Sequence, residues 1–280
     1  MPTVDEYIEQ IRDLAIIPPV LVSVLSLPDD TDLSFGKLEN MVQSDQVLVA
    51  RMLKLANSPF YSRGNRVTGI RQVITRLGFR TVRSMVAIAL ADSIFMHGNY
   101  RKFKDEVWTH SIATGVLAHY LAHEYKMKEY EDFALVAGLL LDLGKVVLNS
   151  LDRKKYIEVL TEFLDEGQTK PIEEIEEKHF GVRSEIIAVE AARLWQLPPS
   201  VIEILEERPQ KIEEQKDLSK LLNLADLLVR KLGFGKCQSH HESELEQYAE
   251  FYGITLSEEY LETKKKQIEG DGLYQFCLSL

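Results

Sequence analysis

Residues 137–148 read AGLLLDLGKVVL and form one of the most apolar stretches of the chain. Ten of its twelve residues are apolar or glycine, yet Asp142 lies in the middle and Lys145 follows three positions later. Burying an unpaired charge costs roughly several kcal/mol, so a buried aspartate needs a partner. We therefore expect a helix in the protein interior. Asp142 would bind a metal ion, take part in catalysis or form a salt bridge.

The composition around this stretch is that of an ordinary soluble globular protein. The chain has 280 residues, with 45% hydrophobic and 28% charged residues, which is enough for one large domain or two small ones. No apolar stretch is expected to approach the roughly 18 residues of a membrane span, and the polar, acidic N-terminus does not resemble a signal peptide. Cys237 and Cys277 form neither a disulfide framework nor a metal-binding pair. The predicted location is therefore cytoplasmic.

Charge is unevenly distributed along the chain. The net charge of −11 argues against general nucleic-acid binding. Residues 46–91 nevertheless contain no acidic residue and eight basic ones: Arg51, Lys54, Arg63, Arg66, Arg71, Arg76, Arg80 and Arg83. These side chains could pair with carboxylates elsewhere in the fold, or they could form a surface for an anion or a partner.

Helical periodicity dominates the sequence, and no segment alternates as a strand does. The prediction is an all-α protein. A helix is expected after Pro19, and Ser34, Asp45 and Thr68 are expected to cap the next three, the last of which ends at Gly78. Further helices are predicted near 80–95, 104–125, 131–149, 153–167, 171–180, 184–196, 199–207, 217–232, 244–252 and 257–268. The last eleven residues are apolar enough to dock on the body.

Several apparent motifs are rejected as sites. Gly138 and Gly144-Lys145 imitate a phosphate-binding loop, but the spacing is five instead of four and Val146 replaces the required hydroxyl residue. His119 and His123 are spaced as metal ligands on one helix face, yet they are expected on its outer side. The remaining metal-binding candidates, Cys237, His240 and His241, stand in a polar loop.

Three other polar residues each stand in a separate apolar helix. They are His110, in VWTHSIATGVLAHYL, Asp142 in the opening stretch, and Asp226 in KLLNLADLLVRKLG. A single residue of this kind is usually a satisfied polar group of the core. Three of them on separate apolar helices are more suggestive of a function than one alone.

At this point the chain resembles a known family, the HDOD domain. Residues 45–61 carry D-x-x-L-x-x-x-x-L-x-x-A-N-S-x-F-Y, and residues 70–78 carry I-x-x-x-I-x-x-L-G. The later segments VWTHSIATGVLAHYLA, FALVAGLLLDLGKVVL and LLNLADLLV are similar to the core of the HD-superfamily metal-dependent phosphohydrolases. The resemblance covers about residues 10–230, and residues 234–280 match nothing recognisable.

The resemblance implies which metal ligands are present and which are lost. His110, Asp142 and Asp226 occupy three of the expected ligand positions. The other histidine positions are filled by Leu141, Ser184 and the pair Glu206-Glu207. Leucine has no lone pair to donate. Ser184 is expected to cap its helix, and both glutamates are expected in solvent.

These observations predict an HDOD domain over residues 1–233, with an N-terminal helical part at about 1–98, an HD-like part at 99–233 and a C-terminal extension at 234–280. The expected function is non-catalytic regulation or signal transduction of a bacterial type, through binding of a protein partner or a small ligand, without a cofactor or a membrane. His110, Asp142 and Asp226 would form a vestigial metal site. Asp142 is expected to find its partner in His110, Lys145 or backbone amides, in that order.

Two other functions stay open. One is a metal-dependent phosphohydrolase or phosphodiesterase, with any metal held by the same three residues. The other is a nucleotide-responsive binding protein whose arginines between 63 and 83 clamp phosphates. The candidate surface for a partner or an anion consists of Asn57, Ser58, Tyr61, Arg71, Arg76 and Arg80.

Overall fold

The computed structural model describes residues 3–14, 19–28, 32–58, 61–62, 66–95, 103–165, 170–235 and 242–278. The all-α prediction is confirmed: these residues form helices and turns, with no strand among them. The helices are α1 (Val4–Asp13), α2 (Pro19–Leu25), α3 (Asp32–Gln43), α4 (Gln46–Ala56), α5 (Ile70–Leu77), α6 (Phe79–Phe95), the π-helical turn η1 (Lys104–Trp108), α8 (Thr109–Glu124), α9 (Glu131–Leu140), α10 (Leu143–Leu151), α11 (Arg153–Asp165), α12 (Ile172–Phe180), α13 (Ser184–Leu194), α14 (Pro199–Glu207), the 3-10 turn η2 (Ile212–Glu214), α15 (Asp217–Lys231), α16 (Glu242–Phe251), α17 (Glu258–Gly270) and α18 (Gly272–Leu278).

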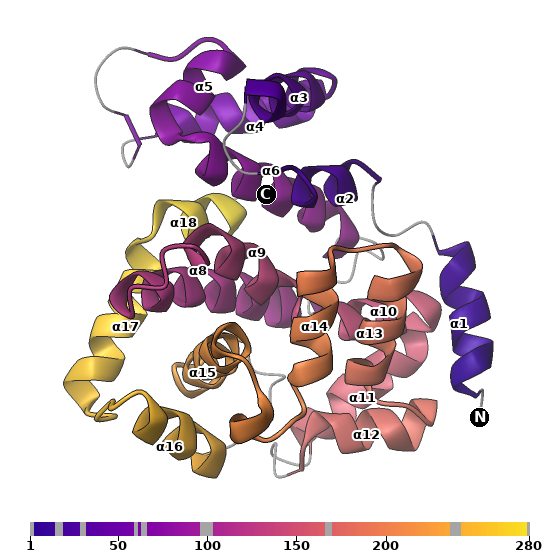
Figure 1. The fold of residues 1–280 in the computed structure, drawn as a ribbon. Helices are drawn as coiled ribbons and strands as arrows, with labels where there is room; N and C mark the ends of the chain where they lie inside the picture. The colour runs from indigo at the N-terminus through magenta and orange to yellow at the C-terminus, as the bar shows by residue number, and fades with distance from the viewer. Residues whose placement is uncertain are drawn as a thin grey trace.

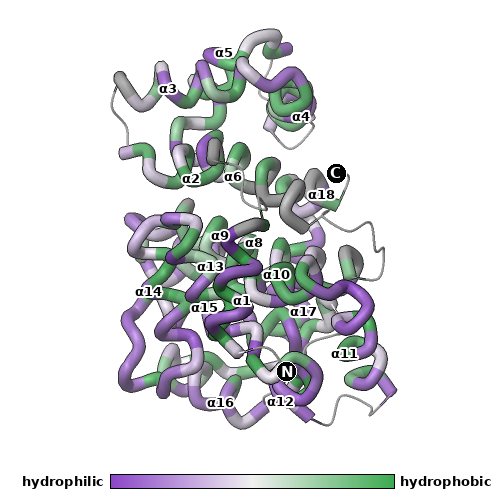
Figure 2. Tube along the Cα trace, turned by 90° about the vertical axis from the view of Figure 1, so that its right-hand side faces the viewer, coloured by the Kyte–Doolittle hydropathy of each residue, from purple (hydrophilic) through white to green (hydrophobic). Residues whose placement is uncertain are grey.

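Helix α6 lies between two groups of helices (Figure 1). It contacts α2, α4 and α5 on one side and α9 and α18 on the other. Figure 2 shows the same arrangement from the side, with α3–α5 standing above α6 and the larger body below it. The predicted boundary near residue 98 lies outside the described residues, and the predicted division into parts stays a prediction.

Local sequence signals explain only some of the N-terminal helices. Asp45 caps α4 as predicted, accepting the backbone N–H groups of Val47 at 2.8 Å and Leu48 at 3.1 Å. The prediction for Ser34 was wrong, because α3 begins at Asp32 and Ser34 lies buried inside it. The prediction for Thr68 was also wrong, since Gly69 precedes α5 and no side chain caps that helix.

Helix α1 was not predicted at all. Thr3 and Glu6 form a capping box at its start, in which each side chain binds the backbone N–H of the other residue. The hydroxyl of buried Tyr7 donates to the carbonyl of Phe180 at 2.8 Å, which fixes α1 against the end of α12.

The core of the body is built on α8, which packs against α9 and α15. A Cβ atom added at Gly138 on α9 would lie 2.6 Å from Cα of Gly115 on α8. Another added at Gly144 on α10 would lie 1.8 Å from the carbonyl oxygen of Ser184 on α13. The two glycines of the opening stretch therefore allow two pairs of helices to approach to backbone contact.

The stretch of residues 137–148 is not one helix, as predicted for 131–149, but two. Helix α9 ends at Leu140, and α10 starts at Leu143. Asp142 has φ −94° and ψ 17°, so its backbone leaves the helical geometry at the break. A carboxylate at such a break can face a neighbouring element, and Asp142 contacts Arg208, which follows α14.

The expectation that no run approaches a membrane span was wrong on length and composition. Within the described ranges, Phe133–Leu151 is long and apolar enough to qualify. Its residues are mostly buried against other helices, as in the core of a globular protein. The C-terminal expectation holds for the described part: Leu273 and Tyr274 of α18 are buried, and α18 contacts α6 and α8.

Candidate functional site

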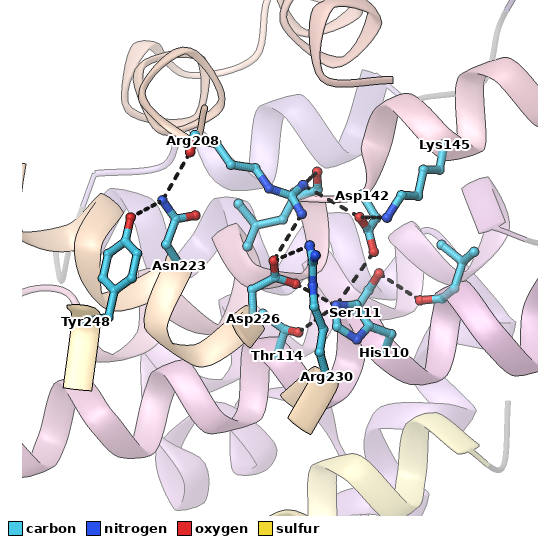
Figure 3. Close-up of polar contacts among 12 residues, drawn as sticks. His110, Ser111, Thr114, Asp142, Lys145, Arg208, Asn223, Asp226, Arg230 and Tyr248 are labelled. Carbon is cyan, nitrogen blue, oxygen red and sulfur yellow. Dashed lines mark hydrogen bonds and ion pairs between the residues drawn. The ribbon is translucent and has the colours of Figure 1, made fainter. Parts of the chain in front are cut away.

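His110, Asp142 and Asp226 meet in the interior, in a cluster of charged side chains (Figure 3). His110 is the second residue of α8, directly after the π-helical turn η1 and Thr109. Its Nε2 atom is 2.6 Å from Oδ1 of Asp226, and its Nδ1 atom is 3.0 Å from the carbonyl oxygen of Phe234. Both ring nitrogens thus lie within hydrogen-bond distance of an oxygen atom.

Asp226 on α15 is held by two arginines as well as by His110. Its Oδ2 atom accepts Nη2 of Arg230 at 2.6 Å and Nη2 of Arg208 at 3.2 Å. Burial opposes the negative charge, but the guanidinium groups of Arg230 and Arg208 outweigh it and hold the pKa of Asp226 well below its ordinary value. Asp226 is therefore an ionised carboxylate in the core.

Asp142 occupies the break between α9 and α10. Its Oδ1 atom accepts Nζ of Lys145 at 2.8 Å and lies 3.6 Å from Nη1 of Arg208, while Oδ2 is 3.9 Å from Nε2 of His110. Burial opposes the charge, and Lys145 followed by Arg208 lowers the pKa of Asp142 to about 2. The predicted order of partners was wrong, because Lys145 binds Asp142 directly whereas His110 is at ion-pair distance only.

Arg208 was missed by the sequence analysis. It follows the last residue of α14, and its side chain points back into the body between the two aspartates (Figure 3). The same guanidinium donates to the carbonyl oxygen of Leu141, which α9 leaves unpaired at its end. Arg230 was missed too, although its position four residues after Asp226 on one helix was a readable signal.

The other implied ligand positions serve structural purposes. The backbone N–H of Ser184 donates to Oε2 of Glu176 at 2.8 Å; the predicted Ser184 cap was wrong, since Arg183 precedes α13 and no side chain caps it. Glu206 forms a surface ion pair with Arg193. Glu207 was wrongly expected in solvent, because it is buried and accepts the backbone N–H of Lys216 at 2.9 Å.

Glu176 is a second buried carboxyl beside the cluster, and the sequence analysis did not single it out. Its Oε1 atom accepts the hydroxyl of Tyr156 at 2.8 Å, so the side chain joins α11, α12 and the start of α13. Burial, and then the charge of Glu173, raises the pKa of Glu176 to about 7.

The residues of the cluster do not fit a divalent metal ion. A metal needs free lone pairs on the carboxylates and on the imidazole. Here the oxygens of Asp142 and Asp226 face Lys145, Arg208 and Arg230, and Nε2 of His110 faces a carboxylate. Across the part of the chain that the structure describes, no group of three His, Cys, Asp or Glu residues is arranged to hold a metal.

A cavity of about 750 Å³ opens over one side of the cluster. Asp226, Arg208 and Arg230 are part of its lining, together with Asn223, Tyr248 and Glu173. His110 and Asp142, in contrast, are each only about 1% exposed on their side chains. The cavity therefore borders the arginine side of the cluster, whereas the side chains of His110 and Asp142 are buried.

The candidate surface for a partner or an anion is mostly explained by internal contacts. The side chain of Asn57 binds the backbone of Val67 in both directions, at 2.9 and 2.8 Å. Arg71 pairs with Glu39 at 3.3 Å, as the interpretation of these arginines as partners of carboxylates expects. Tyr61 is half-buried and packs against the core, and the backbone carbonyl of Ser58 accepts the N–H of Ser62 at 2.8 Å.

Those of the remaining candidates that the structure describes form no metal-binding group. Arg80 is exposed on α6 and Arg76 half-buried on α5. His119 and His123 both bind Glu131, through its carbonyl oxygen at 3.0 Å and its carboxylate at 3.1 Å. Cys237, His240 and His241 lie outside the described residues.

Known proteins share this fold. The structure is similar to that of an HDOD domain protein of unknown function from Geobacter sulfurreducens, with a TM-score of 0.72 and 20% identity over 99% of this chain and 94% of that one. It is also similar to a candidate phosphohydrolase from Shewanella amazonensis SB2B, with a TM-score of 0.69 and 18% identity over 97% and 96%.

A third similar structure is a candidate signal-transduction protein from Marinobacter aquaeolei VT8, with a TM-score of 0.69, 20% identity and coverage of 97% of this chain and 60% of that one. At such identities the likeness establishes the fold alone. None of the curated proteins compared with the chain matches it.

The family follows from the sequence itself. The sequence profile of the HDOD domain matches residues 14–210, which is most of the chain and includes His110 and Asp142 of the cluster. The helical architecture and the similar structures agree with this match. The chain therefore belongs to the HDOD domain family.

Proposed function

We propose that this chain is a non-catalytic regulatory module that acts by binding a protein partner in a signalling pathway. One observation carries the proposal: three side-chain cations, Lys145, Arg208 and Arg230, neutralise the two aspartates that a hydrolytic metal ion would require. Its expected setting, a bacterial cytoplasm, comes from the sequence analysis.

Metal-dependent hydrolysis places two demands on a site, and this cluster is poorly suited to both. The metal must keep an open coordination position for water, and it must lower the pKa of that water. Leu141 offers no ligand atom at its position, and its side chain is buried. His110 and Asp142 are sealed from solvent, which leaves a phosphoester no approach to them.

Support for a binding role is of another kind. The cavity over the cluster is large enough for a small ligand or a side chain of a partner. One similar structure is named as a candidate signal-transduction protein, and another as a candidate phosphohydrolase. The two names imply different functions, so the charged cluster is the main support for the proposal.

Activity and metal content test the proposal together. The purified protein is analysed for bound metal and assayed on a generic phosphodiester with added Mn²⁺ or Mg²⁺. We expect no turnover above that of the Asp142→Ala variant, with Asp217→Ala as a control at an exposed position. Turnover that Asp142→Ala abolishes and Asp217→Ala preserves would establish the phosphohydrolase alternative instead.

Two further experiments address the ligand. A pull-down from the native host with the intact chain is expected to recover a signalling protein. Thermal-shift measurements with cyclic dinucleotides test the nucleotide-responsive alternative. The absence of stabilisation at millimolar ligand would eliminate it.

A further inference from the structure

Arg208 differs from the other cations of the cluster because it touches both aspartates. Its Nη1 atom is 3.6 Å from Asp142, and its Nη2 atom is 3.2 Å from Asp226. Lys145 binds Asp142, and Arg230 binds Asp226. Arg208 therefore links Asp142, at the break between α9 and α10, to Asp226 on α15. A divalent ion can link carboxylates from separate helices in the same way.

The geometry of a guanidinium suits this position. Its planar fork offers several N–H donors in fixed directions, whereas an ammonium is a compact point charge. Arg208 uses the fork to contact Asp142, Asp226 and the carbonyl of Leu141 at the same time. Its side chain is about 9% exposed, so the contact is largely shielded from water.

The backbone of Arg208 is fixed as firmly as its side chain. Its carbonyl oxygen accepts Nδ2 of Asn223 at 3.3 Å and Nε2 of Gln215 at 3.5 Å. The residues that follow, Pro209 to Glu213, form one wall of the cavity. One residue thus holds the end of α14, the cavity wall and the two aspartates together.

We infer that Arg208 is a resident cation that takes the place of the metal ion of HD-superfamily phosphohydrolases, and that a chain without this guanidinium binds an external guanidinium ion between Asp142 and Asp226. The inference rests on the proposed function only in treating the native site as free of metal. It concerns what holds the site together, and the turnover assay addresses what the site does. Either result can fail without the other.

The test compares Arg208→Ala with the wild type in thermal unfolding. Removing one partner of a buried ion pair is strongly destabilising, so the Tm of Arg208→Ala should fall by about 6 °C or more. Millimolar methylguanidinium chloride should then raise the Tm of this variant and leave the wild type unchanged. MnCl₂ should raise the Tm of neither protein, because Lys145 and Arg230 still pair with the two aspartates.

Two matched variants isolate the site. Arg193→Ala removes an exposed arginine that also touches two carboxylates, Glu190 and Glu206, and it should neither lower the Tm appreciably nor respond to methylguanidinium. Asp142→Asn combined with Arg208→Ala should lose the response. An Arg208→Ala protein whose Tm methylguanidinium does not raise would overturn the inference.

A second pair of variants covers the case in which Arg208→Ala does not fold. Arg208→Lys keeps the charge, and Arg208→Gln keeps hydrogen-bond donors without it. We expect the Tm of Arg208→Lys to fall by at most half as much as the Tm of Arg208→Gln, each compared with the wild type. Equal losses would mean that the charge is immaterial and would overturn the inference as well.

Discussion

Nε2 of His110 and Oδ1 of Asp226 lie 2.6 Å apart, although 116 positions separate the two residues in the sequence. The contact joins α8 to α15, and Asp226 in turn joins both to the end of α14 through Arg208. The prediction from the sequence that these polar residues form one cluster is confirmed in its geometry. The cluster is therefore the point where the distant segments of the body are tied together.

Removing the carboxylate of Asp226 should destabilise the fold strongly. Asp226→Ala leaves Arg208, Arg230 and His110 facing an uncompensated position, and breaking a buried ion pair in this way costs about 3–5 kcal/mol. Urea unfolding measures the loss. Asp217→Ala on the same helix removes a carboxylate that is 80% exposed, and it should change the free energy of unfolding by less than about 0.5 kcal/mol. Equal effects of the two substitutions would contradict this account.

Stability should fall in acid through Asp142. Its pKa is lowered from 3.8 to about 2, so its ionised form is favoured in the folded state. The contribution is complete above pH 4 and is lost as the pH falls from 4 toward 2, with a size of about 2 kcal/mol. Urea titrations at pH 5, 4 and 3 should show this slope in the wild type. It should be smaller in Asp142→Asn combined with Lys145→Met, which removes both partners.

Glu176 should act in the opposite direction and in another pH range. Its pKa is raised from 4.5 to about 7, so the folded state favours the protonated carboxyl. The resulting stability is fully present below pH 4.5 and is lost as the pH rises to 7, by up to about 3 kcal/mol. Glu176→Gln imitates the neutral acid and should flatten the dependence between pH 5 and 8. Glu174→Gln, at an exposed position of the same helix, should leave the slope as it is.

Alanine in place of Gly144 should separate α10 from α13. The added Cβ would lie 1.8 Å from the carbonyl oxygen of Ser184, which is backbone and cannot rotate away. Overpacking of this kind costs about 1–3 kcal/mol. Gly36→Ala is the control, because nothing lies within 4 Å of its Cβ position inside α3. That substitution should stabilise by about 0.5–1 kcal/mol, since glycine is a poor helix former. A stable Gly144→Ala variant would show that the helices can slide apart.

Local rules were sufficient where a structure depends on neighbouring residues. Asp45 caps α4 because an aspartate before an apolar periodic run can satisfy free N–H groups at any such position. The capping box of Thr3 and Glu6 is an equally local signal, which the sequence analysis did not use. Leucines flank Asp142 on both sides, so no adjacent proline or glycine predicted the helix break there.

The role of Arg208 depends on contacts that a single sequence does not reveal. Arg208 reaches Leu141 across 67 positions, and its own neighbours, Glu207 and Pro209, suggest a solvated turn. Reasoning from absent histidines identified which ligand positions were empty, but not which residue filled the space between Asp142 and Asp226. That required the path of the chain after α14.

A cation supplied by Arg208 is made with the polypeptide, in a ratio of one per chain. A site that borrows its cation from solution gains stability in proportion to the logarithm of the ion concentration, and it loses that stability to any chelator. The chain-borne guanidinium removes this dependence. On this inference, the stability of the cluster does not depend on the metal supply of the host, and a chelator should leave the contacts of Asp142 and Asp226 intact.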